Sequence, residues 1–284
     1  MQPLKLGDIE VSRVVENDWV TSPRFLFPGI TPEDLRPYQE WLSPHFYTPE
    51  DDRFQMSIQA FLVRTRHHTI LVDTCVGNDK KRSTPNWNML SGPFLENLKA
   101  QGVAPAQVDF VMCTHLHVDH VGWNTRLVDG KWQPTFPNAK YVFTRAEYDF
   151  WSQAEEEDQA ETFRDSVLPV MEEGLAELVE GEHEIAEGVR LLPTPGHTPG
   201  HSSLLLASGG AEAVITGDMM HHPLQMLEPE RCSRFCNDIE QTVSTRKSFL
   251  ERFSDRDVRI VGTHFHPPTH GHVVPQGDAW RLKV

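Results

Sequence analysis

The sequence has only four cysteines among its 284 residues, and no two of them form a Cys-x-x-Cys pair. A metal site built from several thiolates is therefore not expected. A disulfide framework is not expected either, although a single bridge between Cys232 and Cys236 stays open as an alternative. The cytoplasm is the expected compartment, because cysteines are few and the N-terminus shows no basic segment followed by a long apolar run.

The chain also lacks long hydrophobic runs and is poor in basic residues. No stretch approaches the roughly 18 apolar residues that a membrane-spanning helix needs, so no membrane association is expected. Lysine and arginine total 26 against 41 acidic residues, which gives a net charge of −15 at pH 7. Most of such a surface would repel a polyanion, so nucleic acid is not expected as a partner.

Short apolar runs rich in Val, Ile and Leu recur along the chain and predict β-strands. Helical patterns separate some of these runs, and this alternation predicts an α/β protein whose sheets carry helices on their outer faces. The predicted strands cover 57–63, 70–74, 108–114, 140–144, 189–194, 203–206, 213–216 and 258–262. The predicted helices cover 94–102, 239–253 and two acidic stretches, 145–157 and 162–178.

Residues 20–55 differ from the rest of the chain because they are rich in proline and aromatic residues. Thr31 followed by Pro32 is typical of a helix start. We expect the segment to be an ordered N-terminal arm of one domain that comprises residues 1–284. The arm could cover a functional site or pack on a second subunit in a homodimer, and folding back onto its own domain is an equally open alternative.

Residues 115–120 place four potential metal ligands within six positions, namely His115, His117, Asp119 and His120. Such a concentration next to an apolar strand is costly unless a cation binds it. Alternate residues of an extended chain point the same way, so His115 and His117 can reach one ion while the other two serve a second. Imidazole and carboxylate ligands suit zinc, iron, manganese or cobalt.

Three further candidate ligands follow predicted strands. His197 lies in a turn rich in proline and glycine, and Asp218 and His264 each come shortly after an apolar run. Because all of these sites follow strands, they can converge at one edge of the sheets. His266 competes with His264 for the last position, and we prefer His264. His201 is expected to pack beside the ligands and not to bind metal.

The complete set resembles that of the metallo-β-lactamase superfamily of hydrolases. In chain order it consists of Asp73, His115, His117, Asp119, His120, His197, Asp218 and His264. The resemblance implies a four-layer αβ/βα sandwich with the site at one edge between two β-sheets. It implies that His115, His117 and His197 hold one ion and that Asp119, His120 and His264 hold the other. Asp218 would bridge two divalent ions, with Zn²⁺ as the first expectation, and Asp73 would orient a ligand histidine.

Within the superfamily, residues 196–201 and 217–223 resemble the branch that contains N-acyl-homoserine lactonases and methyl-parathion-hydrolase-like enzymes. Lactonases carry a tyrosine three residues after the bridging aspartate, and it helps to bind the substrate oxygen. This chain has His221 at that position, and a histidine can also donate a proton. We therefore name Asp119 and His221 as candidate catalytic residues, although a surface location for His221 and His222 is equally open.

The resemblance implies hydrolysis of a small ester, lactone or related compound by a hydroxide that bridges the two metal ions. The alternatives are a phosphotriesterase and a glyoxalase-II-like thioesterase, although we see no clear basic site for glutathione. A di-iron redox protein and a non-catalytic metal-binding module are disfavoured by the intact ligand set. Candidate residues for an apolar pocket wall, with core packing as the equal alternative, are Trp123, Met219, Met220 and the aromatic residues of the arm.

Overall fold

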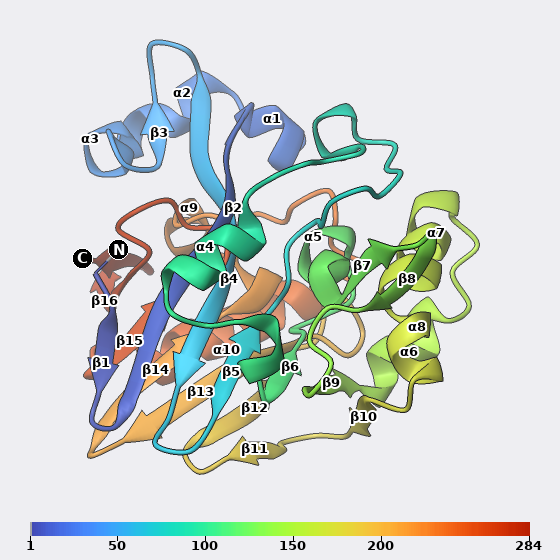
Figure 1. Cartoon of the computed structure of the whole chain (residues 1–284). Helices are drawn as coiled ribbons and strands as arrows, with labels where there is room; N and C mark the ends of the chain where they lie inside the picture. The colour runs from blue at the N-terminus through green and yellow to red at the C-terminus, as the bar shows by residue number, and fades with distance from the viewer. Residues whose placement is uncertain (1) are drawn as a thin grey trace.

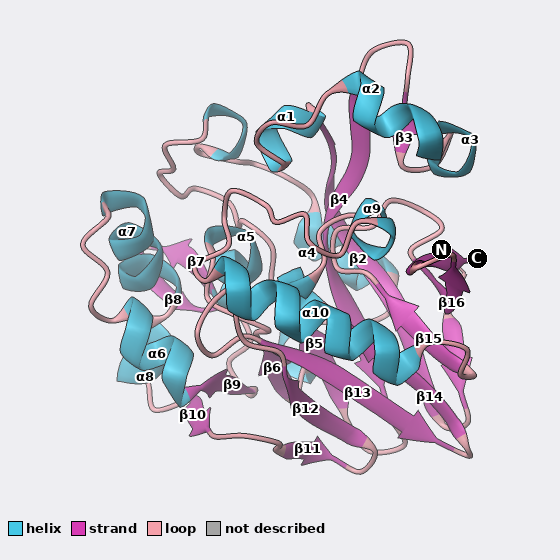
Figure 2. Ribbon diagram, turned by 180° about the vertical axis from the view of Figure 1, so that it is seen from behind, coloured by secondary structure: helices cyan, strands magenta, loops and turns pink. Residues whose placement is uncertain are grey.

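The computed structural model describes residues 2–284. Two β-sheets pack face to face, and helices cover their outer faces (Figures 1 and 2). In the first sheet the strand order is β1-β2-β4-β5-β6-β9-β10, with β3 paired to β4. In the second sheet the strands β11 to β17 follow one another in sequence order, and β7 and β8 form a separate hairpin. The predicted α/β class and the four-layer αβ/βα sandwich are confirmed.

The first sheet comprises β1 (Leu4–Leu6), β2 (Ile9–Thr21), β3 (Tyr47–Thr48), β4 (Arg53–Arg64), β5 (Thr69–Val72), β6 (Phe110–Met112), β9 (Lys140–Thr144) and β10 (Ala176–Val179). The second comprises β11 (Glu184–Ala186), β12 (Val189–Pro193), β13 (Ser202–Ser208), β14 (Ala211–Ile215), β15 (Val258–Val261), β16 (His270–Gln276) and β17 (Ala279–Lys283). The hairpin comprises β7 (Thr125–Val128) and β8 (Lys131–Pro134).

The α-helices are α1 (Pro23–Leu26), α2 (Pro32–Leu35), α3 (Gln39–Leu42), α4 (Phe94–Ala100), α5 (Val118–Val121), α6 (Arg145–Trp151), α7 (Glu157–Ser166), α8 (Leu168–Glu172), α9 (Leu224–Leu227) and α10 (Ile239–Phe253). Short 3₁₀ turns occupy Arg36–Tyr38, Pro85–Trp87, Pro105–Gln107, Gly122–Asn124 and Gly217–Met219. Across residues 2–284, no helix combines the length and the apolar character needed to cross a bilayer.

Alternation along the strands explains why the sheets can be covered on both faces. In β5, Ile70 and Val72 belong to the apolar cluster between the sheets, while Leu71 belongs to the cluster under the outer helices. In β13, Leu204 and Leu206 lie in the central cluster and Leu205 packs on the opposite side. Successive side chains of a strand point to opposite faces, so an uninterrupted apolar run supplies two cores at once.

The strand predictions are confirmed, with ends that differ by a few residues, but the helix predicted over 162–178 is wrong. Those residues contain the end of α7, the short helix α8 and the start of β10. Pro169 lies in the first turn of α8, which begins at Leu168, and Gly174, at φ +68°, lies beyond the end of that helix. The following residues Ala176–Val179 then pair in parallel with β9. The prediction followed polarity and overlooked these two breakers.

The arm of residues 20–55 packs on its own chain. Its α2 begins at Thr31 as predicted, with the hydroxyl of Thr31 accepting from the N–H of Asp34. Buried residues of the arm such as Phe27 and Phe54 belong to the same cluster as Met219 and Met220, beside the second sheet. This packing favours the folded-back alternative, and association into a homodimer stays a prediction. Cys232 and Cys236 are both free, so no bridge joins them.

A buried ionic cluster ties α7 to the loop that follows β5. Asp165 of α7 accepts hydrogen bonds from Nη1 and Nη2 of Arg82, at 2.7 and 2.9 Å. Its carboxylate also lies 3.3 Å from the ammonium of Lys80. Desolvation of the ammonium lowers the pKa of Lys80 to about 8, although Asp165 opposes the shift. One carboxylate therefore compensates two buried cations.

We expect the Asp165→Asn substitution to lower the free energy of unfolding by about 3–5 kcal/mol, because it leaves two buried cations without their anion. Urea unfolding of the metal-free protein measures this loss. The matched control is Glu161→Gln on the same helix, which breaks only the exposed pair with Arg164 and should cost about 0–1 kcal/mol. Equal losses in the two variants would contradict the prediction.

Candidate metal centre

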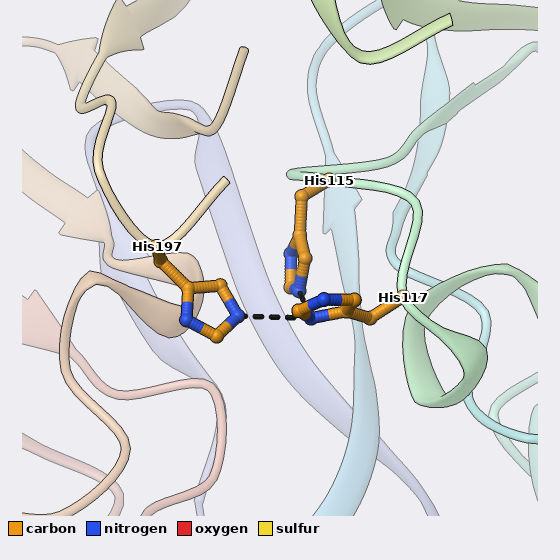
Figure 3. A group of neighbouring side chains, drawn as sticks. All are labelled: His115, His117 and His197. Carbon is orange, nitrogen blue, oxygen red and sulfur yellow. Dashed lines mark hydrogen bonds between the residues drawn. The ribbon is translucent and has the colours of Figure 1, made fainter. Parts of the chain in front are cut away.

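Three imidazoles converge at the ends of β6 and β12. His117 Nδ1 lies 3.0 Å from His115 Nε2 and 2.9 Å from His197 Nε2. Figure 3 shows the three rings pointing toward one another, with His197 arriving from a separate loop. One ring nitrogen cannot form a good hydrogen bond with two others when each neutral ring carries a single proton. Three nitrogen lone pairs directed at one point are, however, the arrangement that a metal ion requires.

A second group lies beside the first and contains Asp119, His120 and His264. Its ligand atoms fall within 4.8 Å of one another, as do those of the first group. His264 Nε2 lies 3.5 Å from Asp119 Oδ2, and His120 Nε2 lies 3.6 Å from Asp119 Oδ1. The two groups correspond to the two sets of ligands expected from the sequence.

Asp218 lies between the two groups. Its Oδ2 is 3.4 Å from His120 Nε2 and 3.6 Å from His197 Nε2, and its Oδ1 is 3.1 Å from His264 Nε2. The residue before Asp218 is Gly217, which has a φ of +56°. A Cβ at this position would lie 2.4 Å from His201 Nε2. A side chain at position 217 would therefore prevent the close approach that places Asp218 in the centre.

In four of the ligand histidines, the ring nitrogen that faces away from the centre has a partner of its own. When the remote nitrogen carries the proton, the other nitrogen presents a lone pair toward the centre. The contacts are His115 Nδ1 to Thr114 Oγ1 (3.1 Å), His120 Nδ1 to Asp73 Oδ2 (3.0 Å), His264 Nδ1 to the Ser57 carbonyl (3.0 Å) and His197 Nδ1 to Cys236 Sγ (3.7 Å).

Burial sets the protonation of the three-histidine group. It lowers the pKa of His115 and His197 well below the usual value, and that of His117 to about 3. These imidazoles are therefore neutral at pH 7, which is the form that binds a metal ion. For His120, burial lowers the pKa, but Asp218 and the other nearby carboxylates outweigh it and raise the pKa overall.

Asp73 stands behind this centre at the end of β5. Its carboxylate accepts the backbone N–H of Thr114 at 2.7 Å and contacts His120 Nδ1 at 3.0 Å. Asp73 has a φ of +59°, a strained value for a residue with a side chain. Such strain persists where the surroundings hold it in place, and here it brings one carboxylate to both the motif backbone and a ligand ring.

The donor set fits divalent cations. Two fully buried atoms in the centre, His120 Nε2 and Asp218 Oδ1, have no hydrogen-bond partner among the described residues. Unpaired buried polar atoms are rare in proteins, and a cation among these atoms would satisfy them. The mixture of imidazole and carboxylate ligands suits zinc, iron, manganese or cobalt.

The neighbouring histidines differ in what they contact. His201 Nε2 accepts the N–H of Asp218 at 2.9 Å, which agrees with the expected supporting position. His221 and His222 are both buried, so the surface alternative for them is wrong. His221 Nε2 lies 3.2 Å from Asp218 Oδ2, whereas His222 stacks on Phe54 and takes no part in the centre.

A cavity of about 290 Å³ opens over the two ligand groups, and its walls correct the sequence-based expectation. Trp123, Met219 and Met220 are buried in apolar clusters and do not line it. The apolar side chains that do line it are mainly Trp19, Trp87 and Phe235. They come from three segments distant in sequence, with no motif that marks them, so only the folded chain brings them together.

The chain resembles known proteins over most of its length. Residues 54–264 match the model of the metallo-beta-lactamase superfamily. An N-acyl homoserine lactonase of Bacillus sp is 30% identical over 175 residues, which are 56% of this chain and 62% of that protein. The match thus spans less than two thirds of that relative. Metallo-beta-lactamase domain-containing protein 1 of Xenopus laevis is 34% identical over 209 residues, 73% of this chain and 72% of the relative.

Two solved structures share the fold across almost the whole chain. The hydrolase AbOPH of the beta lactamase superfamily is 28% identical, with a TM-score of 0.80 over 99% of this chain and 97% of that one. The dizinc quorum-quenching lactonase AidC, solved in complex with N-hexanoyl-L-homoserine as product, has a TM-score of 0.80 over 99% of this chain and 96% of its own. AidC is 20% identical, so this likeness concerns the fold.

We expect the Asp73→Asn substitution to weaken Zn²⁺ binding by about 10- to 100-fold, because the ring of His120 loses its charged partner. Titration of the metal-free protein against a chromophoric chelator measures the affinity. The matched control is Asp109→Asn, since Asp109 Oδ2 accepts the N–H of Thr69 at the opposite end of β5. Unchanged affinity in the Asp73 variant would refute its orienting role.

Proposed function

The chain belongs to the metallo-beta-lactamase superfamily, and we propose that it is a metal-dependent hydrolase of a small, neutral lactone or ester. The observation that carries the proposal is the convergence of two ligand groups on Asp218 beside a cavity lined by aromatic side chains. The similarity to N-acyl homoserine lactonases supports a lactone, and the dizinc lactonase of the same fold supports zinc.

In this proposal each of the two groups of three residues would hold one divalent ion, and Asp218 would contribute a carboxylate to both. Bound together, two such cations lower the pKa of a water molecule toward neutrality and polarise the carbonyl of an ester. An imidazole that binds a metal ion is neutral, so in the metal-loaded centre only Asp119 and Asp218 would contribute negative charge. Two carboxylates cannot cancel two divalent cations, and the centre keeps a positive charge that can stabilise a developing oxyanion.

Two side chains of the centre also face the substrate. Asp119 lines the cavity and is 11% exposed, so its carboxylate can accept a proton released during hydrolysis. His221 lines the same cavity beside Asp218. We assign to His221 an N–H hydrogen bond to a substrate oxygen, the task that a tyrosine performs in lactonases.

The cavity wall favours a neutral substrate. Trp19 and Trp87 pack edge to face with ring centroids 5.7 Å apart, and the ring of Phe235 lines another part of the wall. Glu156 and Asp158 also line the cavity, whereas no lysine or arginine does so in the described part of the chain. Aromatic walls bind apolar groups, and carboxylates without a cation repel anions. A glutathione thioester, which carries free carboxylates, is therefore a poor fit.

We expect the zinc-loaded protein to hydrolyse a neutral N-acyl lactone or aryl ester, and removal of the metal by a chelator to abolish turnover. A glutathione thioester should react with a kcat/KM at least about tenfold lower, because the acidic side chains repel it. Steady-state kinetics on a panel of lactones, esters, phosphotriesters and thioesters measures both differences. The Asp119→Asn protein serves as the inactive control. Turnover of none of these compounds, or preference for a thioester or phosphotriester, would refute the proposal.

We expect His221→Phe to lower kcat by about 10²- to 10³-fold while both metal ions stay bound, because the substrate oxygen loses a hydrogen-bond donor. His221→Gln keeps an N–H and should recover part of the loss. His222→Gln is the matched control, since His222 is an adjacent buried histidine that bonds the Phe46 carbonyl. Loss of one metal equivalent in the Phe variant would instead make His221 a ligand and contradict the assigned role.

A further inference from the structure

A buried carboxylate beside the metal centre has no cation to pair with. Glu147 of α6 is 1% exposed, and its side-chain partners in residues 2–284 are all N–H groups of uncharged residues. Its oxygens accept the N–H of Leu116 at 3.1 Å, the N–H of Gly200 at 2.8 Å and the indole N–H of Trp151 at 2.7 Å. A buried charge is costly, so three donors converging on one carboxylate indicate that the chain needs it there.

The two backbone donors belong to the two loops of the three-histidine group. Leu116 lies between His115 and His117, and Gly200 lies in the turn that carries His197. One carboxylate therefore holds the two ligand-bearing loops to each other through one hydrogen bond on each side. Neither bond engages a ligand ring directly, so Glu147 acts on the backbone that positions the rings.

The third donor reaches a ligand by another route. The ring of Trp151 packs edge to face on His117, with ring centroids 5.1 Å apart. Because the indole N–H is bound to Glu147, the carboxylate also holds this ring in place. In the three-histidine group, His115 and His197 have a partner for the ring nitrogen that faces away from the centre, and His117 has none among the described residues. The contact with Trp151 therefore restricts the rotation of the His117 ring.

The contact between α6 and the His197 loop leaves little room for movement. Thr144, the N-cap of α6, donates its hydroxyl to the carbonyl of Gly200 at 2.8 Å. A Cβ at position 200 would lie 2.5 Å from Thr144 Oγ1 and 2.6 Å from the backbone nitrogen of Glu147. Only glycine allows this approach, so the position of Glu147 relative to the loop is closely determined.

We propose that Glu147 is a positioning residue that fixes the separation of His117 and His197, and so sets the affinity for the metal ion held by the three histidines. Ligand nitrogens bind zinc at about 2.0–2.1 Å, so a shift of a few tenths of an ångström in one loop weakens the ion's hold. This inference rests on the proposed function, because it assumes that the three histidines bind a metal ion.

The test replaces Glu147 with Gln. The amide keeps the shape of the side chain but offers one oxygen and directs an NH₂ group toward an N–H donor. Binding of one Zn²⁺ equivalent should weaken by about 10- to 100-fold, the usual effect of losing a supporting contact. The second equivalent should bind as in the wild type, and kcat should approach the wild-type value at saturating Zn²⁺. Competition with a chromophoric chelator measures both affinities.

Glu16 provides a matched control. It is also a buried carboxylate, 7% exposed, and it accepts from two backbone N–H groups, those of Val76 and Gly77, and from the indole of Trp123. None of these donors lies in the two loops of the three-histidine group. Glu16→Gln should therefore lower the unfolding midpoint to a similar degree and leave the affinity of that equivalent unchanged.

A milder variant guards against loss of folding. Trp151→Phe keeps an aromatic ring near His117 but donates no hydrogen bond to Glu147, so it should weaken the same equivalent by less than Glu147→Gln does. Wild-type affinity in both variants, or equal weakening in Glu16→Gln, would overturn the inference. Failure of the wild-type protein to bind zinc would instead overturn the proposed function.

Discussion

The constraint on which the site depends is the burial of Asp218. Five imidazole nitrogens lie within 3.8 Å of its Oδ atoms, and its ion-pair partners in residues 2–284 are all histidines, with no lysine or arginine among them. If all five rings were protonated they would repel one another, and if all were neutral the carboxylate would lie uncompensated in a medium of low polarity. Burial lowers the pKa of His115 and His197, whereas nearby carboxylates, Asp218 among them, outweigh burial and raise the pKa of His120 and His264, so only some of the five rings can carry charge in the metal-free centre. Divalent cations held by the two ligand groups would compensate Asp218 without protonated rings.

The two sheets bring the polar side chains of the centre together at one edge. Strands β5 and β6 run parallel in one sheet, and β14 and β15 run parallel in the other, so their carboxyl ends meet at one edge. The loops that follow β6 and β15 are short, and each of the segments that follow these four strands carries at least one polar side chain to the centre. Apolar clusters between the sheets and under the helices provide the stabilisation that the polar edge lacks. The polar centre thus lies at the edge of the sheets, outside the apolar clusters that stabilise the fold.

The sequence predicted eight of the seventeen strands of residues 2–284 and the ligand candidates, because these leave local signals. Four potential ligands within residues 115–120 are visible without any structure, and apolar runs identify strands that are buried on both faces. Strand β2 was not predicted, since polar residues such as Arg13 interrupt it and are satisfied only across the sheet by Gln59 and Ser57. The cavity wall and the clamp at Glu147 had no local signal either, because every contact that defines them joins segments far apart in the chain.

This difference explains why the chemistry is easier to infer than the substrate. Metal ligands must be of a few residue types, and four of the candidates lie within residues 115–120, so the pattern is visible in the sequence. Substrate contacts need only shape and polarity, and Trp19, Trp87 and Phe235 reach the cavity from a strand, a 3₁₀ turn and a loop. The acidic side chain Asp158 also lines the cavity, and it belongs to α7. The buried Asp165 of the same helix pairs with Lys80 and Arg82, and these ion pairs hold α7 in position. The acidic side of the cavity therefore depends on an ionic cluster that lies outside the metal centre.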